Sequence, residues 1–354
     1  MRTVAYSRST AVSTTSRRHL FLPLVAFASL VAPHLIRTTS SSSMLLQVEA
    51  AYSSPKIADA RKQRLVYGSN DALFGHIEKQ QGKKPIGSFL DAGTGLHSLR
   101  WIATLANDDV DNPKLKDSLV TTMTDFTAVT ADETMRKNVQ REVDELGMSH
   151  LGQVVIGNWF PPDGDDSQSL SSIDTDGEGN LKKYDTILAD YLIGAMDGFS
   201  PYTQDQMIEK LTKRLKPGGR LYIVGLQPIP DSFGKADSPQ NIICEVRRAR
   251  DACILLAGQR CYREYPLDWI ERQVNATKAP DASLKFLDSE QFPILYKHTT
   301  IVKQINVGRR KFRKFPTKEL VDSMTTVLDD LEKRSKEATD KSPNNRIELG
   351  FDYV

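Results

Sequence analysis

Polar side chains that could bind or orient a ligand stand directly after apolar runs at several points of this sequence. Asp91 follows an apolar pair and precedes two glycines at alternate positions, Gly93 and Gly95. Such glycines let the backbone approach a ligand closely at the start of a helix. Later apolar runs end in Asp132, Asn158 and Asp190. This pattern indicates a nucleotide-like ligand at the carboxyl ends of neighbouring strands.

The elements that must position these residues alternate between strand and helix. We expect strands at 86–90, 126–130, 153–156, 184–189 and 220–224. Helices are predicted at 96–105, 134–146 and 203–215, and a Lys-Pro-Gly-Gly turn precedes the fifth strand. Further helices are predicted at 242–257 and 266–276, and strand-like runs at 284–287 and 299–307. The fold class is therefore α/β, a Rossmann-like doubly wound sheet, mostly parallel, with a terminal antiparallel hairpin.

The predicted sheet is flanked by further helices and loops. A helical stretch within 55–79 precedes it, with Leu65, Leu73, Phe74 and Ile77 as the expected buried side. A C-terminal helix begins after Pro316, and we expect it to pack on the domain through Leu320, Val321, Met324, Val327, Leu328 and Leu331. Residues 107–118 are interpreted as a surface loop and 161–180 as an acidic insertion. The tail beyond Asp340 is expected to be loose.

The first fifty residues differ in composition from the rest. They hold five arginines and no acidic residue before Glu49, and the uncharged run 20–32 is short for a membrane span. We interpret 1–50 as a targeting leader that resembles a bipartite chloroplast and thylakoid sequence. A secretory signal and a membrane anchor are the competing interpretations. The remaining organisation is a domain over 55–315 and a C-terminal helix with its tail over 316–354.

Overall charge and cysteine spacing narrow the function classes. The net charge of +2 indicates neither a nucleic-acid-binding protein nor an acidic one. Cys244, Cys253 and Cys261 lack the spacing of metal ligands, so no metal site is expected. We interpret them as buried or half-buried free thiols, with one disulfide as the alternative in an oxidising compartment.

The chain resembles the class I S-adenosylmethionine-dependent methyltransferase family over roughly 67–307. The motifs that carry the resemblance are Asp91-x-Gly93-x-Gly95, the residues at the ends of the later strands, and the turn 216–219. The resemblance implies S-adenosylmethionine as cofactor, with Asp91 near its methionyl ammonium, Asp132 on the ribose hydroxyls and Asn158 at the adenine. Trp159 would stack on the adenine ring. The expected cofactor-binding residues are Asp91, Ala92, Gly93, Thr94, Gly95, Asp132, Asn158 and Trp159. The sequence departs from the family at His97, where a third glycine is common, and Asp125 is the rival for the ribose.

The family places its substrate-facing residues after the fourth strand. Asp190 and Tyr191 are therefore the catalytic candidates, and Asp197 and Tyr202 are further candidates for contact with substrate. The expected activity is methyl transfer to a small molecule or a protein. The alternatives are a non-catalytic assembly protein on the same fold, an NAD(P)-dependent oxidoreductase, and an RNA methyltransferase that grips RNA through 309–315.

Other motifs are better explained by ordinary surface structure. Residues 174–185 resemble a calcium loop, but Lys182 and Asp185 stand where ligands of a different type are expected. The basic run 309–315 is more often a solvated charged surface than a nucleic-acid site, and nucleic acid is not an expected partner. His76 and His97 are expected to be structural.

Overall fold

The computed structural model describes residues 68–106, 123–161, 170, 173, 175–279 and 282–354. The leader 1–50, Leu65, the loop 107–118 and most of the acidic insertion lie outside the described residues. The strands are β1 (Gly87–Asp91), β2 (Met123–Thr130), β3 (Gly152–Ile156), β4 (Tyr184–Asp190), β5 (Leu215–Leu226), β6 (Lys278–Ala279), β7 (Ala282–Ser283), β8 (Gln291–Tyr296) and β9 (Ile347–Tyr353). The α-helices are α3 (Gly68–Gln81), α4 (Leu96–Ala106), α5 (Glu133–Glu145), α6 (Leu192–Ala195), α7 (Gln204–Lys213), α8 (Gln240–Leu256), α9 (Leu267–Ala276), α10 (His298–Arg309) and α11 (Lys318–Asp340).

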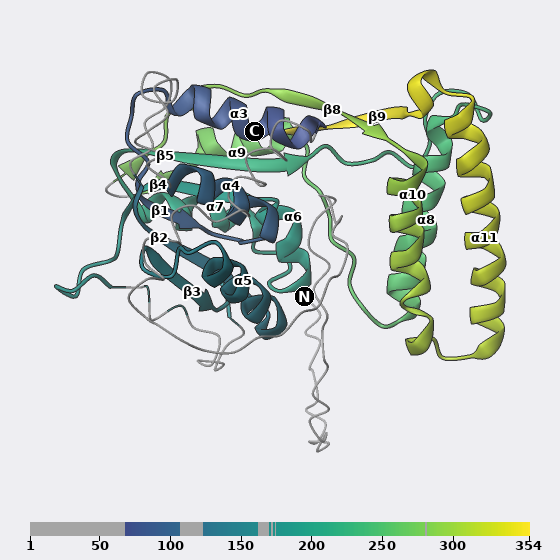
Figure 1. Ribbon diagram of the computed structural model, residues 1–354, viewed down its shortest axis with the longest axis horizontal. Coiled ribbons are helices and arrows are strands. Elements are labelled where there is room, and N and C mark those ends of the chain that lie inside the picture. The colour runs from purple at the N-terminus through teal and green to yellow at the C-terminus, as the bar shows by residue number, and fades with distance from the viewer. Residues whose placement is uncertain (1–67, 107–122, 162–169, 171–172, 174, 280–281) are drawn as a thin grey trace, which may run out of the picture.

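Seven strands form one sheet in the order β3-β2-β1-β4-β5-β9-β8 (Figure 1). β1 to β5 run parallel, whereas β9 pairs antiparallel with both β5 and β8. The order reverses between β1 and β4, so this is the switch point of a doubly wound sheet, where ligands of such sheets bind. The predicted fold class, a Rossmann-like doubly wound and mostly parallel sheet with antiparallel strands at its end, is confirmed, although β8 and β9 are joined through α10 and α11 and do not form the predicted hairpin.

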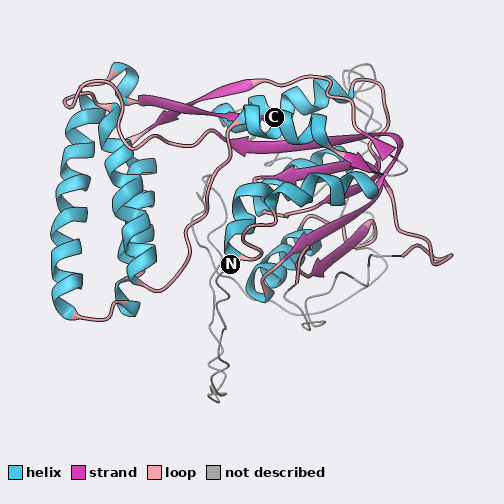
Figure 2. Cartoon of the chain, turned by 180° about the vertical axis from the view of Figure 1, so that it is seen from behind, coloured by secondary structure: helices cyan, strands magenta, loops and turns pink. Residues whose placement is uncertain are grey.

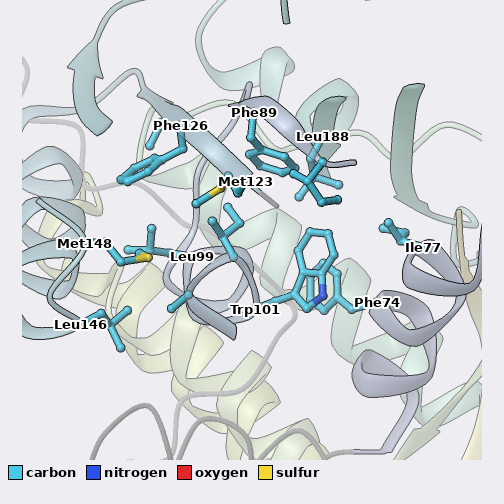
Figure 3. Close-up of a cluster of buried hydrophobic side chains, with 14 of the residues drawn as sticks. Phe74, Ile77, Phe89, Leu99, Trp101, Met123, Phe126, Leu146, Met148 and Leu188 are labelled. Atoms are coloured by element: carbon cyan, nitrogen blue, oxygen red, sulfur yellow. The ribbon is translucent and has the colours of Figure 1, made fainter. Parts of the chain in front are cut away.

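Helices cover both faces of this sheet, as the two opposite views show (Figures 1 and 2). Neighbouring residues of a strand point to opposite faces. Phe89 accordingly joins the core under α3, α4 and α5, whereas Leu90 joins the core under α6, α7 and α9. Figure 3 shows the first of these cores, in which Phe74 stacks on Trp101 with ring centroids 4.7 Å apart.

The Lys-Pro-Gly-Gly segment is placed differently from the prediction. It lies inside β5, which begins at Leu215, and α7 ends at Lys213. Tyr184 pairs with Leu215 and Thr186 pairs with Arg220, so residues 216–219 form a bulge in the strand. Lys216 anchors the bulge, because its Nζ lies 2.7 Å from the Asp185 carboxylate.

The predicted hairpin strands at 284–287 and 299–307 are wrong. Residues 284–287 follow the two-residue strand β7, and 299–307 lie in the helix α10. The β-branched residues around Ile301 favour a strand locally. Burial favours a helix, because Ile301, Ile305 and Gly308 repeat at helical spacing and pack against α8 and α11.

The prediction of a loose tail beyond Asp340 is also wrong. After α11 the chain forms β9, which inserts between β5 and β8, so the tail supplies the central strand of the antiparallel part. Tyr353 is buried there, and its Oη donates a hydrogen bond to the Tyr265 carbonyl at 2.7 Å. The last strand of the chain, β9, is therefore an integral part of the sheet.

α8, α10 and α11 pack into a three-helix unit beside the end of the sheet (Figure 1). α10 and α11 form the connection between β8 and β9. The expectation that the C-terminal helix packs on the domain is confirmed for Leu328 and Leu331, which are buried, whereas Val327 is exposed. The three cysteines are buried free thiols. Within the described residues, no helix has the length and apolar character needed to cross a membrane.

Candidate functional site

The loop 92–95 is held across the carboxyl ends of three strands at the switch point. The Ala92 N–H donates to the Leu188 carbonyl of β4 at 2.8 Å, and the Thr94 N–H donates to the Val129 carbonyl of β2 at 2.8 Å. α4 begins immediately after this loop. The glycine turn predicted from the sequence therefore lies where this class of sheet binds nucleotide-like ligands.

Asp91 is the buried carboxylate of this loop. Its side chain has no exposed surface, and Oδ2 accepts a hydrogen bond of 2.9 Å from the Ser98 hydroxyl. Its Oδ1 has no hydrogen-bond partner among the described residues. Burial raises the pKa of Asp91 to about 7, although the Ser98 hydrogen bond acts in the opposite direction. A buried acceptor without a partner fits a cationic donor such as the methionyl ammonium.

Gly93 keeps this turn close to α6. A Cβ atom at position 93 would lie 3.0 Å from Leu192 Cδ1 and 3.2 Å from Leu192 Cβ. A side chain here would therefore press on α6 or narrow the space above the loop. The requirement for glycine that the sequence indicated has a direct steric reason.

Asp132, rather than Asp125, lies at the edge of the sheet where the parallel strands have their carboxyl ends. Asp132 follows β2 and caps α5, because its Oδ1 accepts from the Met135 N–H at 2.9 Å. Asp125 lies in the first half of β2 and pairs in register with Ser88. Lys182 lies 3.8 Å from its carboxylate. Of the two candidates for the ribose, only Asp132 is at the correct end of the strand.

Asn158 and Trp159 are engaged in contacts within the protein. The Asn158 amide donates to the Phe199 carbonyl at 3.1 Å, and its Oδ1 accepts from the Phe160 N–H at 3.1 Å. Trp159 is 4% exposed, and its indole N–H donates to the Ala92 carbonyl at 2.7 Å. Because that ring is in the core, the expected stacking of Trp159 on adenine does not fit this arrangement. Its position instead fixes the loop that follows Asp91.

Asp190 and Tyr191, the predicted catalytic candidates, lie together at the end of β4. Burial, and then the charges of Asp91 and Asp352, raise the pKa of Asp190 well above its usual range. Tyr191 has a φ of 49°, a left-handed conformation that costs about 1–3 kcal/mol for a residue with a side chain. Its Oη donates to Asp352 Oδ1 at 2.7 Å. Strain of this kind persists where the surrounding contacts hold a functional group in place.

Two acidic residues that sequence reasoning missed complete this cluster. Asp352, on β9, is 5% exposed, and burial raises its pKa to about 6 despite the Tyr191 hydrogen bond. Glu264 precedes α9, and burial raises its pKa to about 7, with a smaller contribution from Asp352. The alternation of Ile347, Leu349 and Phe351 is a strand signal that could have identified β9. No local signal marks Glu264.

Asp197, which is buried, and Tyr202 both contact Arg260. Arg260 donates to the Asp197 carboxylate at 3.0 Å, and its guanidinium lies 5.1 Å from the centre of the Tyr202 ring. Tyr202 is 80% exposed. Both residues are therefore engaged by Arg260.

His97 and the calcium-like loop are accounted for by local structure. His97 stacks on Phe74 at 5.2 Å, and burial followed by the Arg100 charge lowers its pKa to about 4, so it is neutral. In the calcium-like segment Asp174 lies outside the described residues. Asp176 Oδ1 accepts from the N–H groups of Glu178 and Asn180 at 2.9 Å each. Within the described residues no three His, Cys, Asp or Glu side chains are arranged to bind a metal ion.

Part of the basic run is used inside the three-helix unit. The Arg309 guanidinium lies 2.6 Å from Asp329 and 2.5 Å from Glu332 of α11. Lys311 donates to the Gln259 side chain at 2.6 Å. Phe312 and Phe315 pack against the core of the unit. These contacts tie α10 to its neighbours and favour a structural role.

Comparison with known proteins concerns the fold. No model of a protein family matches the sequence, and no curated protein matches it. Solved structures that match include the [4+2]-cyclase SpnF, at 15% identity over 78% of this chain and 78% of that chain, with a TM-score of 0.40. The cyclopropane synthase MmaA2 from Mycobacterium tuberculosis is 12% identical over 76% and 78%, with a TM-score of 0.37. A SAM-dependent methyltransferase from Geobacter sulfurreducens, in complex with S-adenosyl-L-homocysteine, is 11% identical over 86% and 92%, with a TM-score of 0.34.

The strand order and directions of this chain themselves define the fold. β1 to β5 are parallel, and the order in which they are added to the sheet reverses between β1 and β4. An antiparallel strand from the end of the chain, β9, pairs with β5. The chain therefore has a Rossmann-like, doubly wound fold with antiparallel strands at one end of the sheet.

Proposed function

We propose that this protein binds S-adenosylmethionine at the carboxyl ends of β1, β4 and β2 and transfers its methyl group to a small molecule or a protein. The observation that carries the proposal is Asp91, a fully buried carboxylate whose Oδ1 has no partner among the described residues. It lies at the switch point of the sheet, directly before the glycine turn.

Charge distinguishes this cofactor from a nicotinamide dinucleotide. Asp91 and Asp352 are buried and Asp190 is half-buried, and the charges of Asp91 and Asp352 both raise the pKa of Asp190, so the site holds three interacting carboxyl groups. The pyrophosphate of NAD would add negative charge at this position, and Coulomb repulsion in a poorly solvated site is strong. A sulfonium and an ammonium would relieve the same repulsion. The arrangement therefore favours adenosylmethionine.

The residues of the chain then have distinct tasks. Asp91 would accept from the methionyl ammonium, and Asp132 would accept from the ribose hydroxyls through the oxygen that does not cap α5. The loop 92–95 would lie against the ligand with no side chain at Gly93. When bound, the cofactor supplies a methyl group activated by a positively charged sulfur. In-line displacement at that carbon needs mainly positioning, which a site on rigid strand ends provides.

Binding titrations test the proposal directly. Calorimetry with S-adenosylhomocysteine and with NAD should show binding of the first only, and Asp91→Asn should weaken it. Asp125→Asn is the matched control, because it removes a carboxylate from the other end of the neighbouring strand. Binding of NAD alone would overturn the proposal. Binding of S-adenosylhomocysteine without methyl transfer to any fraction of a cell extract would instead identify a non-catalytic assembly protein.

We also propose chloroplast targeting by residues 1–50, on their composition alone. Fusion of 1–50 to a fluorescent protein should direct it to chloroplasts. Entry of the fusion into the secretory pathway would support the alternative.

A further inference from the structure

Five basic side chains lie at one end of the three-helix unit, where the chain passes from α10 through the short helix η4 (Phe312–Lys314) to α11. They are Arg310, Lys311, Arg313, Lys314 and Lys318. Lys311 is half-buried and the other four are exposed. The turn between α10 and α11 is at the end of the unit that points away from β8 and β9 (Figure 1). Together these five side chains form the basic tip.

α8 ends beside the same turn. Lys311 donates to the side chain of Gln259, just after α8, at 2.6 Å. Val307 of α10 packs with Ile254 of α8, so these two helices end close together. α11 runs back from the turn for 23 residues, about 35 Å, before the chain reaches β9. The basic tip is therefore placed far from the sheet that carries Asp91.

The charges of the basic tip are not balanced by ion pairs. In the part of the chain that the structure describes, none of its five side chains pairs with a carboxylate. Arg309, directly before them, is in contrast held by Asp329 and Glu332. Between positions 310 and 322 the sequence holds five cations and only two carboxylates. The tip therefore keeps a net positive charge.

The helix ends at the basic tip offset only a small part of this charge. The carboxyl end of a helix carries about half a negative elementary charge, so α8 and α10 together balance about one of the five cations. The remaining cations repel one another. Burial, and then the positive charges of Lys314, Arg310 and Arg313, lower the pKa of Lys311 accordingly. An anionic partner outside the chain would relieve this repulsion.

The apolar side chains at the basic tip favour a lipid surface over a nucleic acid. Proteins that grip single-stranded RNA offer aromatic rings on which bases stack. Phe312 and Phe315 instead pack against the core of the three-helix unit, with ring centroids 5.3 Å apart. Leu255, near the end of α8, is 57% exposed and aliphatic. Cations beside an exposed aliphatic side chain suit the interface of an anionic membrane.

We propose that the basic tip docks the protein on an anionic lipid membrane, with its cations among the headgroups and Leu255 at the boundary with the acyl chains. This inference goes beyond the proposed function and does not depend on it, because the tip shares no residue with the candidate cofactor site. Each Lys or Arg near an anionic membrane contributes a factor of about five to binding. Five cations and two carboxylates should therefore give a preference of about 100-fold for anionic over neutral lipid at low salt.

The first experiment is sedimentation of the full chain with vesicles of phosphatidylcholine, or of equal parts phosphatidylcholine and phosphatidylglycerol. Arg313→Gln combined with Lys314→Gln should weaken binding to the anionic vesicles about 30-fold. Lys333→Gln combined with Lys341→Gln is the matched control, because both lysines are exposed and lie toward the other end of α11. The basic leader is present in every protein compared, so the difference between the two double variants isolates the contribution of the basic tip.

Two further measurements separate the electrostatic and the apolar contributions. In about 1 M salt, where the Debye length is about 3 Å, the difference between the double variants should disappear. Leu255→Ala should weaken binding to the anionic vesicles about fivefold, because it removes half-exposed apolar surface that the membrane would bury. Leu287→Ala is its control, because Leu287 is 58% exposed and lies outside the three-helix unit.

Equal binding of the two double variants to anionic vesicles would overturn the proposal, as would equal binding of the wild type to neutral and anionic vesicles. Salt-sensitive RNA binding or self-association that Arg313→Gln with Lys314→Gln removes, while vesicle binding stays unchanged, would assign the basic tip to another partner. If this double variant does not fold, Arg310→Gln with Lys318→Gln replaces it with the same expectation. Affinity for S-adenosylhomocysteine should be the same in all these proteins, so failure of the cofactor proposal leaves the membrane test intact.

Discussion

Asp91→Asn should affect stability and cofactor binding in opposite directions. The folded chain raises the pKa of Asp91 from 3.8 to about 7, which corresponds to about 4 kcal/mol of unfavourable folding free energy once the group is ionised. Between these two values the folded state holds the proton that the unfolded state has lost. Stability contributed at this position therefore falls as the pH rises from about 4 to 7.

Asparagine does not titrate, so the variant escapes this penalty. Its advantage over the wild type should grow by about 3 kcal/mol between pH 5 and pH 8, measured by urea unfolding without ligand. The new amide can carry a cost that does not depend on pH, for example an unsatisfied donor at the former Oδ1. Such a cost changes the free energy of unfolding equally at pH 5 and at pH 8, so it cancels in the difference.

Binding should show the reverse pattern. A hydrogen bond between charged groups contributes about 1.5–3 kcal/mol, so Asp91→Asn should weaken S-adenosylhomocysteine by about 10–100-fold at pH 8. Wild-type affinity should fall about tenfold per pH unit below 7, because the ligand then has to displace a proton from Asp91. The variant should show no such slope in calorimetry. The reasoning would be refuted if the affinity for S-adenosylhomocysteine depended on pH equally in the two proteins. It would also be refuted if the stability advantage of the variant over the wild type were the same at pH 5 and pH 8.

Three further perturbations test the fold. Gly225→Ala should destabilise the protein by about 3 kcal/mol in urea unfolding, because the new Cβ would lie 2.2 Å from Tyr353 Oη; Gly177→Ala, which meets no atom within 4 Å, is the control, and similar effects of both would contradict the packing argument. Deletion of 347–354 should abolish cooperative thermal unfolding followed by circular dichroism, because it leaves β5 and β8 without the strand between them; an unchanged melting temperature would show that β9 is dispensable. Arg309→Ala should lower the free energy of unfolding by about 1 kcal/mol, because it removes the ion pairs with Asp329 and Glu332. It should leave RNA binding in a filter assay unchanged. Salt-sensitive RNA binding that the substitution removes would instead favour an RNA methyltransferase.

The residue sequence alone determined the parallel half of the fold and the position of the ligand turn. Apolar runs, helical periodicity and the Asp91-x-Gly93-x-Gly95 spacing are local patterns, and each lies within about a dozen residues. They placed β1 to β4 and α4, α5 and α9 within a few residues of the observed bounds. They also placed Asp132 at the carboxyl edge in preference to Asp125, because only Asp132 follows its strand.

Tertiary structure alone decided the rest. The residues around Ile301 favour a strand by local preference, but burial against α8 and α11 makes them helical. β9 pairs with a strand more than a hundred residues earlier, and this pairing brings Asp352 to Tyr191. The sequence predicts Asn158 and Trp159 as contacts of the adenine, yet their polar groups form hydrogen bonds within the protein itself. Tyr191 and Asp352 meet only because β4 and β9, which are distant in sequence, lie in the same sheet, and no local pattern records such proximity.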